Sequence, residues 1–422
     1  MSNQKKQWGA IIVMIALFAM IAFVTNLCSP MAIIVKNDFG ASNVLAQIGN
    51  YGNFIAYLVM GIPAGMIIAK IGYKKTALLG LVIGIIGILI QWASGHVGKE
   101  YAFAIYLIGA FISGFTMCIL NCVVNPMLNL LGGGGNKGNQ LIQIGGVFNS
   151  TAAVCVYILM GALIGDAAKA HIADATPALM IALAIFVIAF IVISLTKIDE
   201  PEQAPVDTSL IKGALSFRHF KLGILGIFLY MGIEVGVPTY ILQFLTSEQG
   251  GSMAASTVGL IVAVYWLMML VGRFIGGAIG GAVSSRTQIT IVSTLTIVLV
   301  LFGMFAPESM QVNVPAIDWA TLTVTSESVP VGIFAFLLVG LCTSVMWGGI
   351  FNMAVEGLGK YTAIASGIFM TMVFGCAVMV AIQGWVADLT GSYMTSYWVV
   401  VFCAAYLLFY ALVGSRVSKR EE

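Results

Sequence analysis

The sequence has 422 residues, of which 60% are hydrophobic and 9% are charged. A typical soluble domain has about 25% charged residues, so this composition excludes a water-soluble globular protein. The formal net charge of +2 provides no basic surface for nucleic acid, and we expect no nucleic-acid partner.

Long apolar stretches follow one another along the whole chain. Each can cross about 30 Å of hydrocarbon as a helix, and none shows the period-two pattern of a barrel strand. Backbone groups in lipid must bond within their own segment, so we predict an all-α membrane protein with twelve transmembrane helices in two six-helix halves. The predicted spans are residues 8–35, 44–69, 75–94, 101–131, 140–165, 177–196, 219–246, 253–282, 287–306, 330–352, 362–388 and 393–414.

Basic residues gather in the connections on one side of these helices. The opposite connections hold Lys36, Lys99 and Lys169. The positive-inside rule therefore predicts that both termini are cytoplasmic. The basic residues on the predicted cytoplasmic side are Lys5, Lys6, Lys70, Lys74, Lys75, Lys137, Lys197, Lys212, Arg218, Lys221, Arg286, Lys360, Arg416, Lys419 and Arg420.

A charged stretch at residues 197–218 interrupts the apolar pattern after six spans. We interpret it as a cytoplasmic linker between an N-terminal bundle, residues 1–196, and a C-terminal bundle, residues 219–422. The halves echo each other, because Asn26 and Pro30 in the first span have the same separation as Glu234 and Pro238 in the seventh. Such duplicated halves are typical of carriers that hold a solute at the midplane and open alternately to the two sides.

Polar side chains deep in these spans are the candidate solute ligands, because they are costly in lipid unless they have a partner. Amides both donate and accept hydrogen bonds, as a polyhydroxylated solute requires, and tryptophan rings can stack on a sugar ring. The alternative is that the asparagines only bridge helices. The predicted solute-binding residues are Asn50, Asn53, Asn121, Asn125, Glu234, Trp266, Trp347 and Asn352.

Glu234 is the acid predicted to lie deepest in the bilayer. It is a candidate proton carrier, cation ligand or hydroxyl acceptor, against the alternative of a structural acid paired with a neighbouring helix. Arg273 lies near the cytoplasmic end of the eighth span and is a candidate gating or structural residue. Lys74 and Lys75, in the second-to-third connection, are further gating candidates.

Other sites have little support in the sequence. The seven cysteines lie inside predicted spans, and the three histidines lie in loops or at span ends, without metal-ligand spacing. We therefore expect no disulfide, no metal, no cofactor and no enzymatic activity.

Several segments resemble the major facilitator superfamily, and within it the fucose:proton symporter family of sugar carriers. The stretch Gly65 to Lys75 is similar to the superfamily's second-to-third loop, except that Ala69 replaces its usual acid. The more specific matches are Ile62-Pro63-Ala64-Gly65, Asn125-Pro126, Leu131-Gly132, Phe148-Asn149-Ser150, Gly232-Ile233-Glu234-Val235, Val271-Gly272-Arg273-Phe274, Val355 to Tyr361 and Gln383 to Asp388. The resemblance implies a monomeric twelve-helix sugar importer of the bacterial inner membrane, commonly coupled to protons.

The sequence departs from this family at two coupling positions. Where the fucose symporters have acids, this chain has Ser29 and Asn121, and neither exchanges a proton near neutral pH. Glu234 is the remaining coupling candidate, and a uniporter or a carrier coupled to another cation stays an alternative. Carriage of a nucleoside or drug, and a sugar sensor that does not transport, are the alternative functions.

Overall fold

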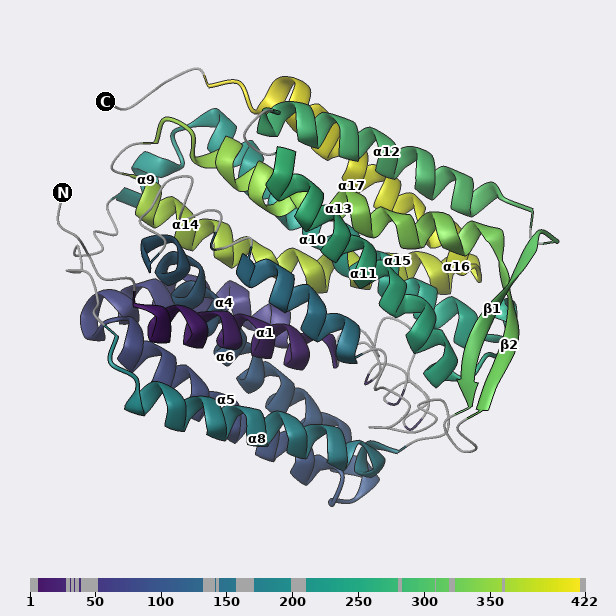
Figure 1. The fold of residues 1–422 in the computed structure, drawn as a ribbon, viewed down its shortest axis with the longest axis horizontal. Coiled ribbons are helices and arrows are strands. Elements are labelled where there is room, and N and C mark those ends of the chain that lie inside the picture. Colours follow the sequence, from purple (N-terminus) through teal and green to yellow (C-terminus); the bar gives the residue numbers. More distant parts are fainter. Residues whose placement is uncertain are drawn as a thin grey trace.

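The helices form two bundles, one built from residues before the linker and one from residues after it (Figure 1). The computed structural model describes residues 7–27, 31, 34, 38, 52–131, 141, 144–156, 171–198, 210–279, 283–307, 309–318, 323–358 and 361–417. Among the residues singled out for solute binding or coupling, Ser29 and Asn50 lie outside these ranges.

The N-terminal bundle is centred on the long helix α6. This helix packs against α1, α4 and α5, and α5 in turn packs against α8. The helix α1 contains no charged residue, as a lipid-embedded segment requires. The elements are α1 (Trp8–Asn26), α4 (Gly52–Ile71), α5 (Tyr73–Ser94), α6 (Lys99–Leu131), the helix Ile144–Val156, the 3₁₀ turn η1 (Ile172–Ala175) and α8 (Thr176–Leu195).

The C-terminal bundle is centred on α10, which packs against α11, α13, α15 and α17. Its elements are α9 (Leu210–Ala214), α10 (Arg218–Thr246), η2 (Glu248–Gly250), α11 (Ala255–Ile279), α12 (Ser285–Phe305), β1 (Gln311–Asp318), β2 (Thr323–Pro330), α13 (Val331–Val355), α14 (Thr362–Thr371), η4 (Met372–Phe374), α15 (Gly375–Thr390), α16 (Tyr393–Ser396), α17 (Trp398–Phe409) and the π-helical turn η5 (Tyr410–Gly414). The short helix α9 lies within the predicted linker.

The helices agree with the predicted spans. Within the described ranges, ten helices are long and apolar enough to cross a membrane, and Phe54–Ile68 and Ile144–Val156 are shorter apolar helices. Each predicted span coincides with one of these segments. The antiparallel hairpin of β1 and β2 was not predicted.

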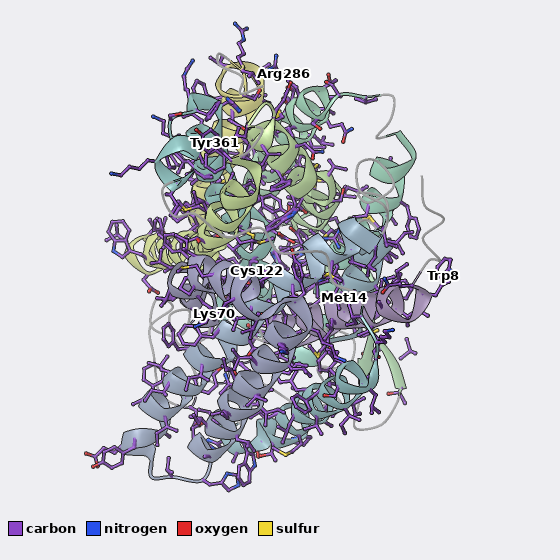
Figure 2. All side chains as sticks on the ribbon, turned by 90° about the vertical axis from the view of Figure 1, so that its left-hand side faces the viewer. Trp8, Met14, Lys70, Cys122, Arg286 and Tyr361 are labelled. Atoms are coloured by element: carbon purple, nitrogen blue, oxygen red, sulfur yellow. The ribbon has the colours of Figure 1, made fainter. Side chains whose placement is uncertain are left out.

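The two ends of the molecule are distinct (Figure 1). We call the end that carries α9 and the start of α1 the linker side, and the end that carries β1 and β2 the hairpin side. Figure 2 is viewed from the linker side, with Arg286 and Tyr361 in the C-terminal bundle above and Lys70 in the N-terminal bundle below.

The bundles pack directly against each other where α4 meets α14, η4 and α15. A Cβ atom on Gly61 of α4 would collide with the side chain and backbone of Thr371 in α14. Glycine is therefore required at this crossing, because any larger residue would push the two bundles apart.

Candidate functional site

A cavity of about 160 Å³ lies between the two bundles. It is lined by residues of α1, α4, α6 and the helix Ile144–Val156 on one side, and of α10, α11, α13, α14 and η4 on the other. A cavity of about 150 Å³ holds one benzene molecule in a protein core, so this space suits one small ring-shaped solute. Its place between the duplicated halves is where carriers of this architecture hold their solute.

The N-terminal face of the cavity is made of amides and a tyrosine. The Asn121 amide nitrogen donates to the Tyr57 hydroxyl at 2.7 Å and to the Met117 carbonyl at 3.1 Å. Asn125 lies one turn later on α6 and donates to the Asn121 carbonyl at 3.0 Å. The helical spacing of these two residues places both on one face, as the sequence predicted.

Two further amides line the same face. The Asn26 nitrogen donates to the Ala22 carbonyl at 2.7 Å, and the Asn149 nitrogen donates to the Phe18 carbonyl at 3.0 Å. Because the nitrogens of these amides donate to protein carbonyls, their oxygens are the groups best placed to accept from solute hydroxyls.

The C-terminal face carries two opposite charges. Glu234, in the middle of α10, and Arg273, in α11, both line the cavity and attract each other electrostatically. The Tyr230 hydroxyl, one turn before Glu234, donates to the Thr343 carbonyl of α13 at 3.3 Å and interacts electrostatically with the Glu234 carboxylate. This face can therefore accept from a hydroxyl or bind a cation through Glu234, and can donate through Arg273.

Pro238 explains how α10 is fixed at this point. A proline lacks the N–H that would bond to the carbonyl four residues earlier, which here is the Glu234 carbonyl. The Tyr265 hydroxyl of α11 donates to that carbonyl at 3.0 Å and lies 3.2 Å from the Thr343 hydroxyl of α13. Three helices are thereby joined at the residue that carries the buried acid.

Aromatic rings complete the C-terminal face. Trp347 packs edge-on against Tyr230, with ring centroids 6.3 Å apart, and against Phe369 at 5.5 Å. Trp266 lies in the wall beside Tyr265, with centroids 5.4 Å apart. Edge-to-face contacts of this kind orient the rings and give the cavity a rigid apolar wall.

The structure brings together most of the predicted solute ligands. Asn121, Asn125, Glu234, Trp266 and Trp347 all line the cavity. Asn53 lies in the first turn of α4, and its side chain is outside what the structure describes. Asn352 is exposed near the end of α13 and does not line the cavity.

The predicted gating residues lie in different places. Arg273 lines the cavity, and Lys75 is exposed at the start of α5. The Lys74 ammonium donates to the carbonyls of Ser194 and Thr196 at 3.1 and 2.8 Å, at the C-terminal end of α8. A cation at a helix C-terminus is stabilising, so this contact joins α5 to α8 within one bundle. Gating by Lys74 and Lys75 stays a prediction.

Two duplicated six-helix halves around a central polar cavity define the class of secondary carriers that open alternately to the two sides. The chain belongs to the Major Facilitator Superfamily, whose sequence profile matches residues 13–381.

Its curated relatives are sugar transporters. The chain is 29% identical over 424 residues to the glucose/galactose transporter of Brucella abortus biovar 1 (strain 9-941), covering 98% of this chain and 96% of that protein. It is 28% identical to the putative glucose/galactose transporter of Helicobacter pylori (strain J99 / ATCC 700824), covering 96% of each. It is 20% identical to the L-fucose-proton symporter of Escherichia coli (strain K12), covering 96% of this chain and 92% of that protein.

Solved structures confirm the fold. A crystal structure of the E. coli fucose:proton symporter superposes with a TM-score of 0.72 at 19% identity, covering 98% of this chain and 100% of the other. A structure of the same symporter in the outward conformation gives a TM-score of 0.71 at 20% identity. The predicted twelve-helix facilitator fold is thus confirmed, and the profile match confirms the predicted superfamily.

Proposed function

We propose that this protein carries a monosaccharide across the bacterial cytoplasmic membrane by alternating access. The observation that carries this proposal is the central cavity, which combines an amide face, an aromatic face and the deep acid Glu234 in a volume of about 160 Å³. The names of the relatives, glucose/galactose transporter and L-fucose-proton symporter, support a hexose as the solute class.

Each face has a role in this proposal. Asn26, Asn121, Asn125 and Asn149 accept hydrogen bonds from the sugar hydroxyls, while Trp347 and Trp266 cover the apolar face of the ring. Glu234 accepts from a further hydroxyl and changes its charge during the cycle. Asn50 and Asn53 remain candidate ligands on the N-terminal side, and Asn352 has no support as a ligand in this state.

Coupling is assigned to Glu234. Ser29 and Asn121 occupy the positions of the fucose family's acids, so Glu234 is the acid of the central cavity within the described ranges. A buried carboxylate that alternates between charged and neutral forms is a suitable carrier for a proton. Coupling to another cation and uniport are the outcomes that the experiment below separates.

The orientation follows from charge. Lys70, Lys74 and Lys75 lie at the connection between α4 and α5, and Arg286 lies at the start of α12, all on the linker side. The positive-inside rule places this side and both termini in the cytoplasm. The resemblance to the fucose symporters, and not the orientation, supports a monomeric importer. We expect it to work without a cofactor.

The test is uptake of labelled hexoses into proteoliposomes, with and without an imposed pH or sodium gradient. We expect gradient-driven accumulation of glucose, galactose or fucose by the wild type and its loss in Glu234→Gln. The matched control is Glu248→Gln, which removes an exposed carboxylate in η2 on the hairpin side. Downhill flux that ignores both gradients would make the protein a uniporter, and absence of flux for every hexose would overturn the sugar assignment.

A further inference from the structure

Arg273 makes a hydrogen bond that crosses from one bundle to the other. It lies in α11, about 9 Å of helix axis before Ile279 at the linker-side end. Its guanidinium Nη1 donates to the backbone carbonyl of Gly146, in the helix Ile144–Val156 of the N-terminal bundle. The bond therefore joins the two halves on the linker side of the cavity.

Gly146 is shaped for this contact. A Cβ atom at this position would lie 3.2 Å from Arg273 Nη1, which is tighter than nine in ten real Cβ contacts, and at an ordinary 3.5 Å from its Cζ. On the other side of the helix, Gly145 packs closely against Leu128 and Phe18. The carbonyl that accepts from Arg273 is consequently fixed to the N-terminal bundle and moves with it.

The positive charge of Arg273 is compensated from its own bundle. Glu234 lines the same cavity and attracts the guanidinium, and among the described residues Tyr230 is the other ionisable group that interacts with the Glu234 carboxylate. A half-buried cation is stable when an opposite charge is near and becomes costly when that charge is removed. A long arginine side chain that loses its compensation can extend toward water at the nearer end of its helix.

We propose that Arg273 is a positioning residue for transport, which couples the charge of Glu234 to closure of the linker side. While Glu234 is charged, it holds the guanidinium between the bundles, where Arg273 binds the Gly146 carbonyl and keeps this side closed. When Glu234 is neutral, Arg273 leaves Gly146 and the linker side opens. The inference rests on the proposed carrier function and adds the link between its coupling acid and its conformational change.

This sequence of events gives an importer the order that it needs. The charged carrier is closed on the linker side and open to solute from the hairpin side. A bound proton neutralises Glu234, removes the bond between Arg273 and Gly146 and lets the linker side open. Because Arg273 interacts with both Glu234 and the Gly146 carbonyl, protonation of Glu234 is enough to open the linker side. No further acid is then needed at positions 29 and 121.

The test measures the distance between the bundles on the linker side. Spin labels are placed at Lys70→Cys and Arg286→Cys, two exposed positions at the linker-side end of α4 and the linker-side start of α12, in a transport-competent variant without its native cysteines. Double electron–electron resonance then gives the distance distribution for the wild type, Glu234→Gln, Arg273→Ala and the double variant. Arg218→Gln, which removes an exposed linker-side charge, and Glu248→Gln are the matched controls.

We expect a mainly short distance in the wild type and in both controls, and a shift toward the longer distance in Glu234→Gln and in Arg273→Ala. The double variant should shift no further than either single variant, because both changes remove one coupled unit. Gly146→Ala, which displaces the guanidinium and leaves both charges in place, should shift in the same direction by less.

Unshifted distributions in both single variants, or additive shifts in the double variant, would overturn the proposal. If Arg273→Ala is not monodisperse, the distances between the spin labels in Gly146→Ala and Glu234→Gln test the proposal instead. If the variants shift the distance distribution but the protein transports no hexose, the sugar assignment is wrong and the coupling between Glu234 and Arg273 stands. If hexose flux is normal and the variants leave the distances unchanged, the coupling alone is wrong.

Discussion

The two faces of the central cavity come from similar six-helix bundles but differ in chemistry. The N-terminal face presents neutral amides, among them Asn121 and Asn125, whose nitrogens are held by nearby carbonyls. The C-terminal face presents Glu234 and Arg273 against an aromatic wall. In our proposal the two faces have different tasks: the N-terminal face recognises hydroxyls, and the C-terminal face changes charge and moves.

The largest expected effect comes from removing the charge on the C-terminal face. Glu234→Gln keeps the shape of the side chain but removes the charge that changes during the cycle in our proposal, so gradient-driven accumulation should fall to the level of downhill flux. Counterflow exchange of labelled hexose should survive, because exchange does not require the charge to cycle. Equal losses of accumulation and exchange would show that Glu234 binds solute without coupling.

A smaller effect is expected on the N-terminal face. Asn125→Ala removes one hydroxyl acceptor, so KM for uptake should rise about 3- to 10-fold with little change in Vmax. Initial rates of hexose uptake over a range of concentrations separate the two constants. The same KM with a reduced Vmax would contradict a binding role for the amide face.

The aromatic wall should contribute to sugar affinity through the apolar surface that its rings offer to the solute. Trp347→Ala removes an edge contact with Tyr230 and a stacking surface, and aromatic pairs of this kind contribute about 0.5–1.5 kcal/mol. We therefore expect a rise in KM of about 2- to 10-fold, measured as before. Trp347→Phe is the matched control and should recover most of the loss, because it keeps a ring against Tyr230 and Phe369.

The spans could be predicted because lipid tolerates few solutions. An apolar segment such as α1, with no charge in it, has to be a helix, and the periodic pair Asn121 and Asn125 has to share a face. The hairpin of β1 and β2 lies outside that constraint and was not predicted, because β2 is mostly polar and exposed and shows no period-two apolar pattern. Asn26 and Asn149 carry no periodic polar signal in their spans, and the sequence analysis did not identify them as residues of the cavity wall.

The contacts between helices could not be predicted from the chain. Pro238 shows that the Glu234 carbonyl needs a new donor, but Tyr265 is identified as that donor only by the packing of α10 against α11. Likewise, the sequence marks Arg273 as a charge near a helix end, and only the meeting of the bundles shows that it reaches Gly146.

The smallest effect is expected for Asn352→Ala, which tests whether the C-terminal face of the cavity excludes Asn352. It follows Trp347 by five residues, which turns it about 140° around α13, so the two side chains cannot face the same cavity. Trp347 lines the cavity and Asn352 is exposed, and Asn352→Ala should therefore change KM by less than about 2-fold. A rise like that of Trp347→Ala would mean that opening of the linker side turns this end of α13 into the solute path, and Asn352 would then be a ligand of the open state.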